Sequence, residues 1–183
     1  MNKIKNYDQI YLIGYRASGK TAVGKTLAKI LNREFIDTDE EIIEQNRMEI
    51  SDIVKKYGWD IFRKKEKALI NSINPSDKII IALGGGAIID SDNIKTAKQN
   101  GTIIYLKTSP DIIKKRLAKD IKTEKNRPSL SNAGTVNEVD KILAERTPIY
   151  NKASDLIINT DNKTIKQICY EINKCLYPQQ NRN

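Results

Sequence analysis

Short apolar runs alternate with longer segments of helical periodicity along most of the chain. The runs are three to five residues long and rich in Ile, Leu, Tyr and Phe, as strands buried on both faces are. They occupy residues 10–13, 34–36, 79–83, 103–106 and 156–158. Apolar residues at helical spacing fill segments near 20–31, 60–73, 91–99, 110–119, 136–150 and 163–176. The alternation predicts an α/β protein with a parallel sheet.

One segment departs from this alternation. Residues 121–134 are polar, show little periodicity and contain one arginine, Arg127. The segment is too long for an ordinary connection between a helix and the next element, and such loops often close over a site. We therefore expect a lid at about residues 121–134.

The first apolar run leads into a phosphate-binding motif. Residues 14–21 read Gly-Tyr-Arg-Ala-Ser-Gly-Lys-Thr and fit the pattern G-x-x-x-x-G-K-[ST] between a predicted strand and a predicted helix. Glycines let backbone N–H groups point at phosphate oxygens, and the helix adds its positive dipole end. Lys20 would reach the β- and γ-phosphates, and the Thr21 hydroxyl would ligate Mg²⁺. The expected nucleotide-binding residues are Gly14, Ala17, Ser18, Gly19, Lys20, Thr21 and Ala22.

Chemistry-bearing residues also follow the next two predicted strands. Asp37 and Asp39 come after residues 34–36, and a glycine triplet at 84–86 comes after residues 79–83. Ligands of open α/β sheets bind beyond the carboxyl ends of the strands. One carboxylate can therefore serve the Mg²⁺ of a nucleotide and the other a second substrate, as a base or as a hydroxyl acceptor. The alternatives are a helix N-cap for the aspartates and a flexible turn for the glycines.

Three arginines stand out among cations that are mostly lysine: Arg63, Arg127 and Arg146. A guanidinium grips carboxylate or phosphate through two hydrogen bonds, which an ammonium group does not do. Arg127, in the expected lid, would close over phosphates. An ion pair on the surface or a structural role on a helix is the alternative for Arg63 and Arg146.

Composition narrows the function classes. The 183 residues predict a single domain, and no run of about 18 apolar residues predicts a membrane span. With no histidine, histidine triads, bases and metal sites are excluded, so a proton acceptor at neutral pH should be a carboxylate. Cys169 and Cys175 lack metal-ligand spacing and predict reduced thiols in a cytosolic protein. The net charge of +9 fits lysines spread over helix surfaces better than a nucleic-acid site.

Taken together, these residues resemble the shikimate kinases, small P-loop kinases of aromatic amino-acid biosynthesis. The resemblance spans roughly residues 10–159 and keeps the order of the family's motifs. The matching pieces are Gly14 to Thr21, Asp37-Thr38-Asp39, Phe62-Arg63-Lys64-Lys65-Glu66, Gly84-Gly85-Gly86, Asn126-Arg127-Pro128 and Arg146-Thr147-Pro148-Ile149-Tyr150. The phosphate loop is shared by many families, whereas the rest of the set is far more specific.

The resemblance implies a three-layer P-loop fold like that of the nucleoside monophosphate kinases, with a five-stranded parallel sheet of order 2-3-1-4-5. It implies a single kinase domain over residues 1–183 with a substrate-binding region at about 37–66. It also implies transfer of the γ-phosphate of ATP, with Mg²⁺, to the 3-hydroxyl of shikimate. We expect a cytoplasmic monomer whose partners are these small molecules, with no nucleic acid and no membrane.

Residue roles also come from this resemblance. On the nucleotide side, Lys20 binds phosphate, Thr21 binds Mg²⁺ and Asp37 supports the metal through water. Arg127 lies over the phosphates as a lid residue, and Arg116 matches a position that stacks near adenine.

On the substrate side, the resemblance makes Asp39 the contact of the reacting hydroxyl. Arg63 and Arg146 hold the substrate carboxylate, and Glu66 orients Arg63. The glycine triplet completes the pocket. It comprises Gly84, Gly85 and Gly86, with Gly85 the expected backbone contact.

The chain departs from the common family pattern at a few positions. Ala17 stands where glycine is frequent, and Ser129 stands where leucine often follows the lid proline. We also expect the segment after Asn159 to lack the basic residue that some members place at the adenine edge.

Two other functions remain open at this stage. A P-loop kinase for gluconate or a nucleotide would share the loop, although paired arginines and a glycine triplet favour a compact carboxylate as acceptor. A non-catalytic module that binds nucleotide or nucleic acid would bind DNA in a salt-dependent way without ATP turnover.

Overall fold

The structure is a computed structural model that describes residues 8–119, 136 and 138–178. Its strands form one parallel sheet in the order β2-β3-β1-β4-β5. The strands are β1 (Gln9–Ile13), β2 (Glu34–Asp37), β3 (Ile79–Ala82), β4 (Gly101–Lys107) and β5 (Leu156–Asn159). The predicted fold class and strand order are both confirmed.

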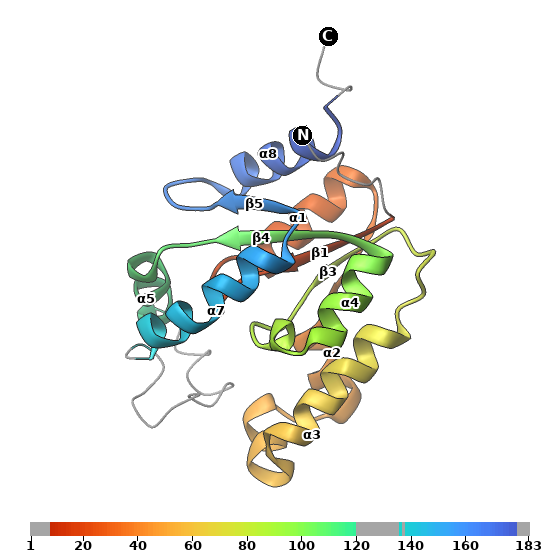
Figure 1. The fold of residues 1–183 in the computed structure, drawn as a ribbon, viewed down its shortest axis with the longest axis vertical. Coiled ribbons are helices and arrows are strands. Elements are labelled where there is room, and N and C mark those ends of the chain that lie inside the picture. The colour runs from red at the N-terminus through yellow and green to blue at the C-terminus, as the bar shows by residue number, and fades with distance from the viewer. Residues whose placement is uncertain (1–7, 120–135, 137, 179–183) are drawn as a thin grey trace.

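Helices cover both faces of the sheet and make three layers (Figure 1). On one face lie α1 (Lys20–Leu31) and α8 (Ile165–Leu176), and on the other lie α3 (Ile50–Ser72), α4 (Ser91–Asn100) and α7 (Val139–Ala153). The remaining helical elements are α2 (Thr38–Asn46), the 3₁₀ turn η1 (Ala87–Ile89) and α5 (Pro110–Lys119). None of the helices in the described ranges is long and apolar enough to cross a membrane.

Strand β1 shows how the core is divided between the two faces. Its side chains alternate because successive residues of a strand point to opposite faces of the sheet. Ile10 and Leu12 pack in the cluster that includes residues of α1 and α8, whereas Tyr11 and Ile13 pack in the cluster of α4 and α7. A central strand buried on both sides therefore reads as a continuous apolar run, which is why it was predicted from the sequence.

The carboxyl ends of three adjacent strands meet at one edge of the sheet. The register pairs Leu12 of β1 with Ala82 of β3, and Ala82 with Asp37 of β2. Beyond these positions come the phosphate loop, Asp39 and the glycine triplet. The fold therefore brings together the three segments that the sequence singled out.

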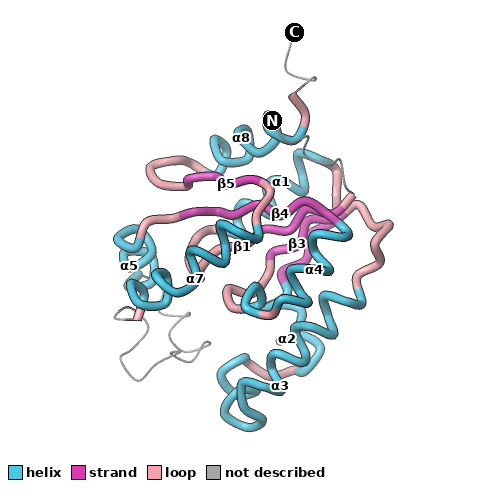
Figure 2. The backbone as a smooth tube through the Cα atoms, viewed as in Figure 1, coloured by secondary structure: helices cyan, strands magenta, loops and turns pink. Residues whose placement is uncertain are grey.

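The sequence analysis missed α2 and the first ten residues of α3. These helices project from the sheet and pack mainly on each other (Figures 1 and 2), so their apolar stripes are short. Only Ile42 is a buried apolar residue in α2, and Gly58, with φ 82°, interrupts α3 between two helical pieces. The helix predicted near residues 136–150 begins later and ends at Ala153. The expected lid at about 121–134 lies outside the described residues.

Candidate active site

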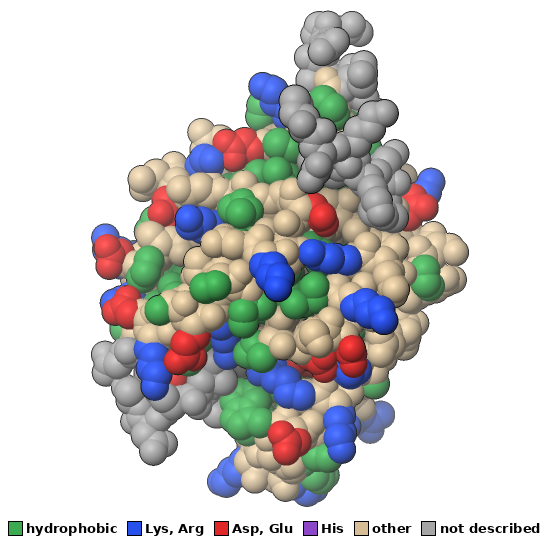
Figure 3. All heavy atoms as spheres, in the orientation of Figure 1, with side chains coloured by type: hydrophobic (Ala, Val, Ile, Leu, Met, Phe, Trp, Pro, Cys, Tyr) green, Lys and Arg blue, Asp and Glu red, His purple; other side chains and the backbone are tan. Residues whose placement is uncertain are grey.

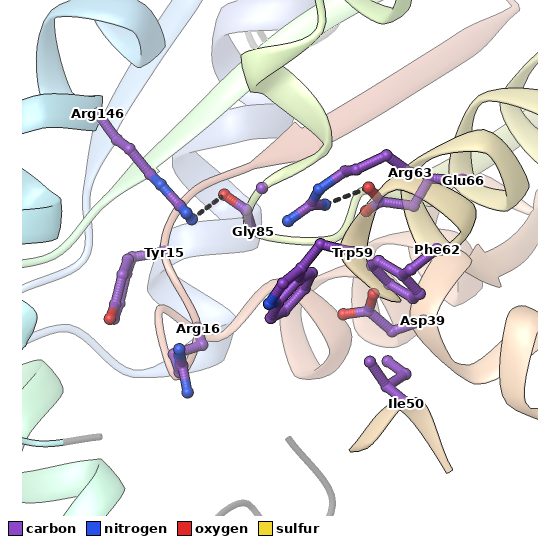
Figure 4. Close-up of a pocket in the computed structure, with 11 residues that line it drawn as sticks. Tyr15, Arg16, Asp39, Ile50, Trp59, Phe62, Arg63, Glu66, Gly85 and Arg146 are labelled. Atoms are coloured by element: carbon purple, nitrogen blue, oxygen red, sulfur yellow. Dashed lines mark hydrogen bonds and ion pairs between the residues drawn. The ribbon is translucent and has the colours of Figure 1, made fainter. Parts of the chain in front are cut away.

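Two cavities adjoin at this edge of the sheet. A small one lies between the phosphate loop, the glycine triplet and helices α3 and α7 (Figure 4). A larger one, of about 650 Å³, lies over the phosphate loop and the starts of α1 and α2. Most of the predicted site residues line one cavity or the other.

The phosphate loop curls around the amino group of Lys20. The Lys20 Nζ donates hydrogen bonds to the carbonyls of Gly14 (2.9 Å) and Tyr15 (3.0 Å). Gly14 and Gly19 have φ values of 148° and 99°, which side chains disfavour, so the pattern needs glycine there. Ala17 also adopts a left-handed conformation, with φ 59°. The loop therefore keeps its shape without the glycine that the family often has at this position.

Asp37 connects the loop to helix α2. Its Oδ2 accepts a hydrogen bond from the Thr21 hydroxyl (2.6 Å), and its Oδ1 accepts one from the backbone N–H of Asp39 (3.1 Å). The two interpretations of Asp37 are therefore compatible, because one carboxylate both caps α2 and faces Thr21. A hydroxyl and a carboxylate beside a phosphate loop suit Mg²⁺, which takes oxygen ligands and completes its shell with water and phosphate.

The far end of the larger cavity is lined by Arg116, Lys163, Ile165 and Ile168. The Arg116 Nη1 donates to the Ala17 carbonyl (2.9 Å), which fixes this guanidinium beside the loop. Lys163 pairs with Glu171 of α8 (2.7 Å). The expectation that no basic residue follows Asn159 at this edge was therefore wrong. Lys163 was missed because a lysine in a polar turn carries no distinctive pattern.

In the small cavity, Arg63 of α3 forms an ion pair with Glu66, one turn further along the same helix (Figure 4). The Glu66 carboxylate is fully buried. A Cβ atom at Gly84 would lie 2.5 Å from Glu66 Oε1 and 2.7 Å from Asp39 Oδ1, and one at Gly86 would meet the Arg63 guanidinium. Gly84 and Gly86 thus leave the space that these three polar side chains occupy.

The third glycine has a different role. The Gly85 carbonyl accepts hydrogen bonds from Arg146 Nη1 (3.1 Å) and from the Tyr150 hydroxyl (2.6 Å). Burial raises the pKa of Tyr150 far above its ordinary value, so this hydroxyl stays a donor. Its ring stacks on Tyr105 with centroids 5.0 Å apart. Tyr150 therefore positions Gly85, a role that the sequence analysis did not assign.

An apolar wall faces these polar groups. Trp59 and Phe62 of α3 meet edge to face with centroids 5.8 Å apart, and Ile50 lies beside them (Figure 4). The Arg63 guanidinium lies 5.2 Å from the centroid of the Trp59 ring. A small anion with a hydrocarbon ring would find both a cationic side and an apolar side here. The sequence analysis missed Ile50 and Trp59 because it did not predict the helical segment before residue 60.

The predicted residues thus separate into two groups, with Asp39 in both. Lining the small cavity are Asp39, Arg63, Glu66, Gly85, Gly86 and Arg146. Lining the larger cavity are Ala17, Ser18, Gly19, Lys20, Thr21, Ala22, Asp37, Asp39 and Arg116. Gly14 and Gly84 stand behind these walls, where they contact Lys20 and the two carboxylates. Arg127 lies outside the described residues.

The model of the shikimate kinase family matches residues 16–177. A shikimate kinase of Syntrophus aciditrophicus is 37% identical over 181 residues, which cover 94% of this chain and 93% of that protein. A shikimate kinase of Hahella chejuensis is 38% identical over 174 residues, covering 95% and 88%. A solved structure of the Acinetobacter baumannii shikimate kinase in complex with shikimate matches with a TM-score of 0.85 at 30% identity and covers 95% of both chains.

Proposed function

The chain belongs to the shikimate kinase family, and we infer that it transfers the γ-phosphoryl group of ATP to the 3-hydroxyl of shikimate. The products are shikimate 3-phosphate and ADP, in the route to aromatic amino acids. The enzyme is therefore a phosphotransferase that acts on an alcohol, and ATP is its second substrate.

The observation that carries this proposal is the small cavity beside the phosphate loop. It places two guanidinium groups, Arg63 and Arg146, across from an apolar wall, with Asp39 at the boundary to the larger cavity. Shikimate offers a carboxylate for the arginines, a ring for the wall and hydroxyls for Asp39. A guanidinium binds a carboxylate with paired, charge-assisted hydrogen bonds, so two of them select a compact anion.

On the nucleotide side, the chain's own residues bind and position the phosphates. Lys20 would exchange its bonds to the loop carbonyls for phosphate oxygens, and the loop N–H groups would hold the β-phosphate. Thr21 and Asp37 would hold Mg²⁺, directly or through water. The cation would neutralise charge on the phosphates. Arg116 and Lys163 would lie toward the nucleoside, and Arg127 stays a prediction for the phosphates.

The reaction forms one bond and breaks one. The 3-hydroxyl oxygen bonds to the γ-phosphorus, and the bond from that phosphorus to the β,γ-bridging oxygen breaks, so that ADP leaves. Asp39 accepts a hydrogen bond from the hydroxyl and takes or directs its proton. Phosphoryl transfer needs mainly positioning and charge stabilisation, which this arrangement supplies.

The rival functions fit less well. A gluconate or nucleotide kinase would share the phosphate loop, but the family match covers most of the chain and names one acceptor. Nucleic-acid binding rested on the net charge of +9. On the face shown in Figure 3, Lys and Arg side chains are scattered among acidic and neutral ones rather than gathered into one patch. We also propose that the enzyme acts as a monomer.

A coupled assay of ADP release, run with MgATP and a panel of acceptors, tests the proposed function. We expect shikimate to stimulate ADP release, and gluconate and nucleoside monophosphates to have little effect. ADP release that shikimate leaves unchanged, but that another acceptor stimulates, would show that the acceptor is misassigned.

A further inference from the structure

Among the described residues, two line both cavities: Asp39 and Arg16. The phosphoryl group has to cross this shared boundary, because the nucleotide lies on one side of it and the acceptor on the other. The proposed function gives Asp39 the acceptor hydroxyl. Arg16, at the third position of the phosphate loop, has no role in the mechanism above.

The Arg16 side chain is buried, with 7% of its surface exposed. Its Nη2 donates to Oε1 of Glu138 at the start of α7 (2.8 Å). Its Nη1 is buried and has no hydrogen-bond partner in the described part of the chain. In Figure 4 Arg16 lies between Tyr15 on one side of the pocket and Trp59 on the other. Glu138 therefore holds one edge of the guanidinium, and the other edge lies at the boundary between the two cavities.

A buried guanidinium N–H without a partner is costly, and the groups that satisfy it best are carboxylate and phosphate oxygens. The Tyr15 hydroxyl is buried in the same cavity and interacts with the Arg16 side chain. A hydroxyl and a guanidinium thus lie together beside the path between the nucleotide and the acceptor. The shikimate carboxylate already has Arg63 and Arg146, so the remaining anion at this boundary is the phosphoryl group.

We propose that Arg16 binds the phosphoryl group as it is transferred and then holds the 3-phosphate of the product. This proposal rests on the proposed function and adds a catalytic residue to it. In this arrangement Glu138 positions Arg16: it occupies Nη2 and leaves Nη1 directed at the phosphoryl oxygens. Arg16 would then discriminate between acceptor and product, because shikimate has no anionic group at its 3-position.

The alternative is a structural role, in which the Arg16–Glu138 ion pair only ties the phosphate loop to α7. The two roles differ in what the partner residue does. A structural pair fails equally when either partner is replaced, and replacing both restores part of the loss. A phosphoryl-binding arginine fails when Arg16 is replaced, whereas a neutral hydrogen-bond acceptor at position 138 preserves its function.

The experiment compares Arg16→Met, Glu138→Gln and the double variant with the wild type. Arg33→Met is the matched control, because Arg33 lies at the opposite edge of the sheet, where it bonds the Asp8 carbonyl and the Tyr177 hydroxyl. The measurements are kcat, the KM for shikimate, and the dissociation constants of shikimate and shikimate 3-phosphate by calorimetry. Binding measured without turnover separates the contact from the chemical step.

We expect Arg16→Met to raise the dissociation constant of shikimate 3-phosphate about ten- to a hundredfold and to lower kcat by a similar factor. This is the usual effect of losing a charge-assisted hydrogen bond. Shikimate affinity should change less than about threefold, within the range of a neutral contact. Arg33→Met should keep product affinity, and Glu138→Gln, which retains a hydrogen-bond acceptor for Arg16, should lower it far less than Arg16→Met does. If Arg16→Met does not fold, Arg16→Lys serves as the test. Lysine keeps the positive charge but lacks the planar guanidinium, so the affinity for shikimate 3-phosphate should still fall more than the affinity for shikimate.

Three outcomes would overturn the role of Arg16: equal losses in Arg16→Met and Glu138→Gln, recovery of product affinity in the double variant, or equal weakening of shikimate and its 3-phosphate. The wild type separates this proposal from the proposed function. A wild type that does not phosphorylate shikimate overturns the function itself. If the wild type phosphorylates shikimate but Arg16→Met binds shikimate 3-phosphate as tightly as the wild type does, only the proposed role of Arg16 is overturned.

Discussion

The hydroxyl of Thr21 donates a hydrogen bond to the Asp37 carboxylate over 2.6 Å, joining the first turn of α1 to the end of β2. The same carboxylate caps α2 through the N–H of Asp39. One side chain thus serves the expected metal site, the phosphate-loop helix and the helix that carries Asp39. This shared use makes Asp37 a residue whose two roles can be separated by choosing the substitution.

We expect Asp37→Asn to raise the Mg²⁺ concentration needed for half-maximal activity and to leave thermal stability nearly unchanged. Asparagine caps helices about as well as aspartate but brings no negative charge to a metal. Asp37→Ala should show the same Mg²⁺ effect and lose about 1 kcal/mol of stability, since it removes the cap. Titrations of activity with Mg²⁺, together with thermal unfolding, check both. Unchanged Mg²⁺ dependence in Asp37→Asn would contradict the metal role.

Asp39→Asn should lower kcat by about 10²–10⁴-fold, the usual contribution of a positioned acid–base group. ATP affinity should stay close to that of the wild type, because Asp37 rather than Asp39 bonds Thr21. Steady-state kinetics and nucleotide binding by calorimetry check this. If nucleotide affinity falls while kcat holds, the two carboxylates have been exchanged in our assignment.

Arg146→Ala should raise the shikimate KM about ten- to a hundredfold, the effect expected from losing a hydrogen bond between charged groups. Arg63→Ala should do the same, but it also removes the ion-pair partner of buried Glu66. For that reason it is best measured together with Glu66→Gln, which removes the buried charge.

The control for both arginines is a shikimate analogue without its carboxylate. It should bind the wild type weakly and respond little to either substitution, because the groups that the arginines grip are gone. If both ligands lose affinity equally, Arg63 and Arg146 hold the fold rather than the substrate.

Trp59 is the only tryptophan of the chain, and it lines the small cavity beside Arg63. Binding of shikimate should therefore change its fluorescence, since the ligand alters the polarity and charge around the ring. ATP alone should have a smaller effect, because Trp59 is absent from the lining of the larger cavity. Trp59→Phe should still turn over shikimate but lose the signal. An emission change with ATP and none with shikimate would contradict the assignment of the two cavities.

Alkaline pH should destabilise the protein through buried phenols. Burial raises the pKa of Tyr11 to about 12, above the value near 10 of an exposed tyrosine. Because the pKa of Tyr11 is higher in the folded state than in the unfolded state, its neutral phenol stabilises the folded state fully below about pH 10. This contribution disappears as the pH rises through about 12. For two pKa units the loss is about 2–3 kcal/mol. Urea denaturation at several pH values should show a shallower alkaline decline in Tyr11→Phe than in the wild type.

The parts of the fold that the sequence predicted are those whose partner is the sheet itself. Buried strands such as β1 and β3 read as continuous apolar runs, and α1 and α8 carry an apolar stripe over several turns. Helix α2 has no such stripe because it packs at the periphery. The first piece of α3 is interrupted at Gly58 after two turns. Periodicity therefore fails where a helix meets another short helix rather than the sheet.

The site residues, like the elements of the fold, divide into those that a local sequence pattern predicts and those that it does not. Residues within motifs, such as Lys20, Asp39 and Arg63, were predicted because their types and spacing are distinctive. Trp59 and Lys163 reach the cavities through the way distant segments fold together, and no local pattern marks them. Arg16 lies within the phosphate loop, but at a position that the motif leaves variable. Arg16 is the clearest case, since its importance depends on Glu138, which is remote in sequence.

The strand order has a consequence for how the protein is made. Strand β1 is made before the other strands of the sheet, yet its register partners stand at Ile79 in β3 and Gly101 in β4. During synthesis this buried strand must therefore wait for about 90 further residues before it gains both neighbours. Parallel sheets built from such distant pairings fold slowly and expose strand edges meanwhile. Newly made chains that stop short of β4 should depend on chaperones, and substitutions in β1 should reduce the yield of folded enzyme more than its activity per folded molecule.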